Sequence, residues 1–87
     1  MSNNDPTTLI RYSGPNVERA LSENPEIHQM INEWAATLKH TTLHINTECE
    51  EGDATLHWAV AVSSPQGRQS YDIKRYTPKG IIQFIRA

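Results

Sequence analysis

The spacing of the apolar residues changes once along this chain, and that change restricts the folds open to it. Between residues 27 and 38, apolar residues recur every three or four positions: Ile27, Met30, Ile31, Trp34, Ala35 and Leu38. On either side of a turn-forming stretch at 51–53, the large apolar residues fall on every second position: Leu43, Ile45, Leu56, Trp58, Val60 and Val62. The first spacing is typical of an amphipathic helix and the second of half-buried strands. Because both need a partner for their apolar face, we expect the helix to pack on one face of a sheet.

Local signals indicate where the helical part begins. Asn24 and Pro25 have the chemistry of an N-cap and a first helical position, so they predict the start of the helix that carries the apolar stripe. A shorter helix is predicted over residues 16–22 by the same helical spacing. We therefore expect an N-terminal helix that is either single or divided into two short ones. Residues 8–12 are apolar enough to form a short strand or to lie extended on the core.

Two predicted turns divide the alternating part and its continuation into three strands. The segments 51–53 and 63–67 carry the glycine, proline and polar residues that tight turns prefer. The three strands should pair as an antiparallel meander, and the third, over about 68–76, should be an edge strand because one of its faces is polar. Thr77 and Pro78 have the residue types that begin a helix, and the apolar residues that follow them have helical spacing.

These assignments predict one α+β domain over residues 8–87. It comprises an N-terminal helix, or two short helices, a three-stranded antiparallel β-meander and a short C-terminal helix, with the helices packed on one face of the sheet. Eighty-seven residues are too few for a second core, and the polar residues 1–7 are predicted to be a disordered tail. Because only 37% of the residues are hydrophobic, a homodimer is one way in which so small a domain would gain stability.

Composition excludes several classes of protein. The net charge of −2 lacks the basic excess of proteins that bind nucleic-acid backbones over a wide surface. Cys49 is the single cysteine, which excludes an internal disulfide and favours a reducing compartment. The first residues lack the apolar segment of a secretory signal, and no apolar run approaches the roughly 18 residues of a membrane span. We therefore expect a cytoplasmic protein with no membrane partner.

Side chains that support catalysis or metal binding are few. His44 and His57 lie on the polar faces of neighbouring predicted strands, where they would bind a metal with Glu48 or Asp72 if the strands aligned them. The intervening turn offsets the two histidines along the strands, which argues against such a site. Cys49 is expected to face the core, and the acidic residues beside it oppose a reactive thiolate. Since no nucleotide, metal or nucleophile motif is present either, we predict no catalytic residue, no metal and no cofactor.

The most distinctive surface is the outward face of the predicted central strand. Ala59 and Ala61 are small and apolar, whereas strand residues that face water are usually polar. Together with their polar neighbours they form a candidate interaction surface: Ala59, Ala61, His57, His44, Glu48 and Glu50. This pattern predicts a non-catalytic protein-binding module, a regulator or inhibitor of the compact kind found among bacterial and phage proteins. Its partner is expected to be another protein or a second copy of the chain.

A basic segment supports an alternative function. The third predicted strand and its exit combine tyrosine with cationic side chains: Arg68, Lys74, Arg75, Tyr76 and Lys79. Aromatic rings stack on bases and cations neutralise phosphates, so these residues are candidate contacts to nucleic acid. Affinity that falls steeply as the salt concentration rises would distinguish this alternative from protein binding.

Overall fold

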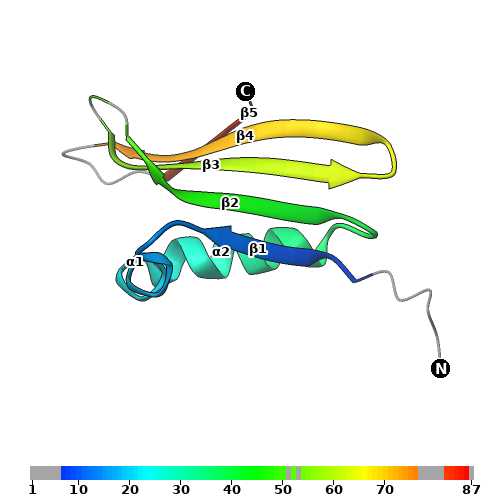
Figure 1. Ribbon diagram of the computed structural model, residues 1–87, viewed down its shortest axis with the longest axis horizontal. Coiled ribbons are helices and arrows are strands. Elements are labelled where there is room, and N and C mark those ends of the chain that lie inside the picture. Colours follow the sequence, from blue (N-terminus) through cyan, green and yellow to red (C-terminus); the bar gives the residue numbers. More distant parts are fainter. Residues whose placement is uncertain (1–6, 51, 53, 77–81, 87) are drawn as a thin grey trace.

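The computed structural model describes residues 7–50, 52, 54–76 and 82–86 of the chain. This part contains two helices and five strands, drawn in Figure 1: β1 (Leu9–Ser13), α1 (Val17–Glu23), α2 (Pro25–Ala36), β2 (Thr42–Cys49), β3 (Ala54–Ser64), β4 (Gly67–Tyr76) and β5 (Ile82–Arg86). The strands form one sheet in the order β1-β2-β3-β4-β5. β1 is parallel to β2, and every other neighbouring pair is antiparallel. The sheet therefore differs from the prediction at both ends.

The first difference is a parallel strand at the N-terminal end of the sheet. β1 pairs with β2 from Leu9 opposite Thr42 to Ser13 opposite Asn46, so the predicted three-stranded, wholly antiparallel meander is wrong. α1 and α2 connect the two strands, because a parallel pair needs a crossover that returns the chain to the same end of the sheet. The five residues of β1 alternate between exposed and half-buried. That pattern is too short to distinguish a paired strand from a segment laid on the core.

The second difference is at the C-terminal end. Ile82–Arg86 forms β5, which pairs antiparallel with β4. The predicted C-terminal helix is therefore wrong over these residues, and β4 is not an edge strand. The free edge of β4 offers backbone hydrogen bonds to the segment that follows it, and the isoleucines of that segment favour extended backbone. The predicted helix start at Thr77 and Pro78 lies outside the described residues.

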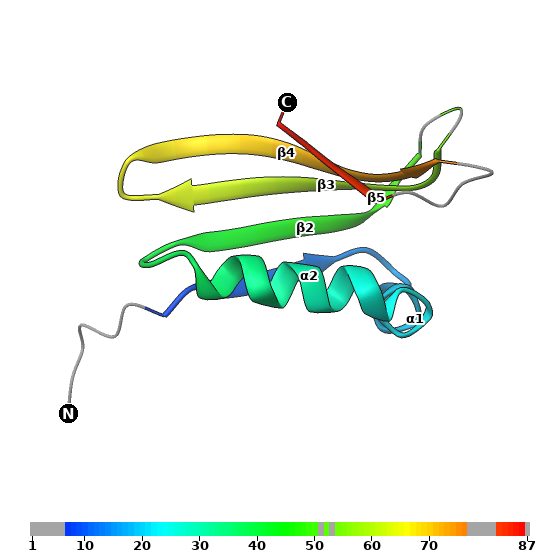
Figure 2. The same cartoon turned by 180° about the vertical axis from the view of Figure 1, so that it is seen from behind.

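The apolar stripe of α2 lies on one face of the sheet. Ile27 and Ile31 are fully buried and Ala35 nearly so. They share one core with the buried strand residues Leu43, Ile45, Trp58, Val60, Val62 and Ile73, and α1 packs at its border. Figures 1 and 2 show the two sides of the molecule, with α2 behind β1 in the first and in front of it in the second. No described element covers the opposite face of the central strands.

Asn24 joins the two helices to the sheet in a way that its predicted N-cap role did not anticipate. Its side chain makes no capping hydrogen bond to α2. Instead its Nδ2 donates to the carbonyl oxygen of Ala20 in α1 at 2.8 Å, and its Oδ1 accepts from Nη1 of Arg75 in β4 at 3.0 Å. Asn24 therefore closes the end of α1 and ties the helix junction to β4.

The hydroxyl group of Tyr12 is buried without a hydrogen-bond partner among the described residues. The Tyr12 ring packs edge-on against the ring of His28, with centroids 6.1 Å apart. Burying a hydroxyl without a partner costs about 1 to 3 kcal/mol. Burial also raises the pKa of Tyr12 above its ordinary value of 10.0, because it disfavours the phenolate.

Tyr12→Phe should therefore raise the free energy of unfolding by about 1 kcal/mol at neutral pH, since it removes only the unsatisfied oxygen. Above about pH 10 the native protein should lose stability, because the unfolded chain releases the Tyr12 proton at lower pH than the folded one. Tyr12→Phe should lose less stability than the unsubstituted protein over that pH range. Urea titrations at neutral and alkaline pH measure both effects, and a loss of stability at neutral pH would show that the hydroxyl has a partner.

Candidate functional site

The candidate site is the side of β2, β3 and β4 that faces away from the helices, here called the open face. Alternation along each strand places on it His44, Asn46, His57, Ala59, Ala61, Ser70, Asp72 and Lys74. The residues form rows across the strands: His44 is opposite Ala61, which is opposite Ser70, and Asn46 is opposite Ala59, which is opposite Asp72. The two alanines thus lie at the centre of the face, flanked by polar residues on both neighbouring strands.

A hydrogen-bonded pair of side chains borders the alanines. Nε2 of His57 lies 2.9 Å from Oδ1 of Asp72, with the two side chains only 15% and 25% exposed. His57 pairs with Lys74 and Asp72 with Ala59, so the contact runs diagonally between β3 and β4. A carboxylate that accepts from one ring nitrogen fixes the orientation of an imidazole. His57 is therefore held in a fixed orientation on the open face.

His44 and His57 are not neighbours. His44 is exposed and pairs with Ala61, four residues along β3 from His57. The offset predicted from the hairpin is therefore present. Among the described residues, no three histidine, cysteine or acidic side chains are grouped closely enough to hold a metal ion.

A bulge in β2 changes the position predicted for Cys49. Asn46 pairs with Ala59 and Cys49 with His57, so two residues of β2 lie opposite Trp58 alone. The extra residue reverses the alternation beyond it, and the prediction that Cys49 faces the core with Leu43 is wrong. The bulge has no signature in the strand sequence. It is supported instead by a contact to β1, since Oγ1 of Thr47 donates to the carbonyl oxygen of Ser13 at 2.9 Å.

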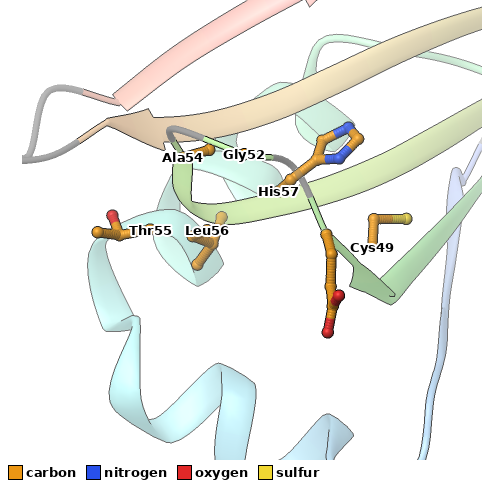
Figure 3. A pocket seen from close by; sticks show the side chains of 7 residues that line it. Cys49, Gly52, Ala54, Thr55, Leu56 and His57 are labelled. Carbon is orange, nitrogen blue, oxygen red and sulfur yellow. The ribbon is translucent and has the colours of Figure 1, made fainter.

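Cys49 and His57 line a pocket at the hairpin end of the open face, shown in Figure 3. Its volume is about 510 Å³, and its other lining residues include Glu50 and Thr55. The Cys49 thiol donates to the carbonyl oxygen of Asn46 at 3.7 Å. The partner of Sγ in this contact is therefore a backbone acceptor within the bulge.

The predicted interaction residues divide into two groups. His44, His57, Ala59 and Ala61 share the open face. Glu48 and Glu50 are exposed at its hairpin end: Glu48 lies beside Gly14 of the β1–α1 turn, and Glu50 lines the pocket. The acidic side chains therefore border the face rather than form part of it. Asp72 belongs to the site through its bond to His57, a contact that only strand register reveals.

The described basic residues of the alternative hypothesis, Arg68, Lys74 and Arg75, do not form one cluster. Arg68 pairs with Ser63 and Lys74 with His57. Arg75 is next to Lys74 in β4 and so points to the opposite face, where it donates to Asn24 at the helix junction. The Tyr76 side chain and all of Lys79 lie outside what the structure describes. Arg75 therefore makes a structural contact that the local sequence does not reveal.

No helix in the described part of the chain has both the length and the apolar character needed to cross a membrane. Comparison of the whole chain with protein-family models, with curated proteins and with solved structures found no match.

Proposed function

We propose that this protein is a small non-catalytic binding module, a cytoplasmic regulator or inhibitor that acts by holding a partner protein against the open face. One observation carries the proposal. Both helices pack on the same side of the sheet, so the other side of the central strands keeps two alanines, Ala59 and Ala61, at its centre without a described element over them.

The composition of the open face suits a protein contact. Specific interfaces have a centre that excludes water and a polar rim that supplies hydrogen bonds. Ala59 and Ala61 allow a partner to approach the sheet closely, and His44 and Ser70 flank Ala61 in its cross-strand row. The bond between His57 and Asp72 orders two of the polar groups beforehand, which lowers the entropy lost when a partner binds.

Ala61→Arg tests this proposal. The side chain would extend from a half-buried position on the open face, leaving the core intact, and would prevent a partner from reaching the sheet. We expect the melting temperature to change little and the affinity for the partner to fall at least about tenfold, a loss of about 1.4 kcal/mol. The control is Gln29→Arg, which adds the same positive charge at an exposed position of α2.

A photo-crosslinking amino acid at Ser70 on the open face identifies the partner in cells that make the protein. The same group at Glu33, exposed on α2, is the control. We expect one protein adduct from position 70 that is absent from position 33 and is lost in Ala61→Arg. An adduct that persists in that variant contradicts the proposal. An adduct with a second copy of the chain identifies the partner as a homodimer mate. Bound nucleic acid that is released by high salt favours the alternative function, nucleic-acid binding through Arg68 and Lys74.

A further inference from the structure

β1 has a free edge. Leu9 N–H donates to the carbonyl oxygen of Thr41 at 2.9 Å, which directs the backbone polar groups of Leu9 toward β2. Backbone groups alternate in direction along a strand, so the N–H and C=O groups of Ile10 and Tyr12 point away from β2. β1 is the first strand in the sheet order, and no described strand lies beyond it. Such an edge accepts an additional strand.

A groove runs along this edge on the helix side, here called the β1–α2 groove. Its volume is about 400 Å³, within the range of about 300 to 1,000 Å³ typical of binding sites. Ile10 and Leu38 give it apolar walls, and the exposed Ala36 lies at its rim. Thr8, which also lines it, has a buried hydroxyl without a hydrogen-bond partner among the described residues.

The opposite side of β1 carries one exposed apolar side chain beside Arg11. Leu9 is 52% exposed and is the one large hydrophobic side chain that is exposed in the described part of the chain. An extended peptide paired with β1 would direct alternate side chains to the two sides of the strand, one toward Leu9 and the next into the β1–α2 groove. Each side of the edge therefore offers an apolar surface to such a peptide.

The charge beside the edge favours an acidic occupant. Lys39 lines the β1–α2 groove, is exposed, and has no ion pair among the described residues. Arg11 is exposed on the other side of β1. Antiparallel pairing of β1 with β1 of a second copy, centred on Arg11, would place the two Arg11 side chains opposite each other, which is destabilising. A segment that carries a carboxylate has no such conflict.

We propose that the free edge of β1 binds an extended, acidic segment of a partner protein as an additional strand, with an apolar side chain in the β1–α2 groove and a carboxylate at Lys39. Backbone hydrogen bonds to Ile10 and Tyr12 hold the segment, and the groove selects its side chains, as in other cases of strand addition. This site is centred on the free edge of β1, whereas the open face is centred on Ala59 and Ala61 of β3, with β2 between them.

Selection of short random peptides displayed on phage against the full chain tests the proposal. We expect the selected peptides to share an apolar residue and an acidic residue on the same face of an extended chain. Hydrogen exchange should show protection of the Ile10 and Tyr12 amides when a selected peptide binds. Synthetic peptides methylated at the strand-facing backbone nitrogens should lose affinity at least about tenfold, whereas methylation of the outward nitrogens should not matter.

Variants of the protein complete the test. Lys39→Glu should reverse the preference from acidic to basic peptides, and Ala36→Arg should lower affinity at least about tenfold by obstructing the rim of the groove. Ala61→Arg on the open face is the matched control and should bind the peptides unchanged. The proposal is overturned if no peptide is enriched, if bound peptides leave Ile10 and Tyr12 unprotected, or if the charge at position 39 has no effect. It is also overturned if the chain dimerises through β1 and excludes the peptides.

Discussion

Trp58→Ala should lower the free energy of unfolding by about 3 to 5 kcal/mol, the range for removing a large aromatic side chain from a core. Trp58 is 3% exposed and packs in the core beneath α2. It also lies opposite the β2 bulge and pairs with Ile73 on its other side. The cavity would therefore open where three strands and the helix meet, a site with little freedom to collapse.

Urea titration followed by circular dichroism measures this loss. A domain of this size has a total stability of about 4 to 13 kcal/mol, so Trp58→Phe is the milder variant that keeps the test measurable if Trp58→Ala does not fold. Trp34→Ala is the comparison, because Trp34 is only half-buried and packs edge-on against Tyr71 with ring centroids 5.4 Å apart. It should cost less than Trp58→Ala. Equal losses would show that the core extends to Trp34, as the helical spacing alone predicts.

Gly14→Ala should cost about 2 to 3 kcal/mol, because it combines backbone strain with a steric clash. Gly14 has a φ of +122°, a conformation that residues with a Cβ rarely adopt. A Cβ there would lie 2.5 Å from Oγ1 of Thr47 and 3.0 Å from Cγ of Glu48. Thr47 cannot yield without losing its hydrogen bond to Ser13, so the β1–α1 turn or the bulge of β2 must move.

Gly67→Ala separates the effect of backbone strain from the effect of the steric clash. Gly67 has a similar φ of +128°, but a Cβ there would meet nothing within 4 Å. This variant should show the strain alone, so the difference between the two losses measures the crowding at the bulge. Denaturant titrations of both variants give that difference. If the two losses are equal, the contact between the β1–α1 turn and the bulge contributes nothing to stability.

Periodicity predicted the parts of the site that depend on one strand at a time. Strict alternation from Leu56 to Ser63 placed Ala59 and Ala61 on the outward face of β3, and the structure has them there. The same reasoning failed for Cys49, because one extra residue in a bulge reverses every position beyond it. Alternation places the adjacent Lys74 and Arg75 on opposite faces of β4, but it could not show that Arg75 donates to Asn24 at the helix junction.

The groove on β1 could not have been predicted from the sequence. Residues 8–12 allow either a strand or an extended segment, and the groove exists only because α2 returns the chain so that β2 pairs with β1 in parallel. The features that the sequence supplied are the exposed apolar Leu9 and the cations Arg11 and Lys39. Whether these residues contribute to a binding site depends on which edge of β1 has no neighbouring strand.

The residue pattern of the chain is enough to predict which face of α2 and of β2 to β4 is buried, because side-chain direction follows from the helical and strand periods within each element. Three features required the folded structure: β1 joins the sheet in parallel, residues 82–86 form a strand, and His57 meets Asp72. Those features depend on backbone hydrogen bonds and contacts between segments distant in the chain. A local pattern shows that a face must be buried or that an edge must be paired. It does not show which distant segment buries that face or pairs with that edge.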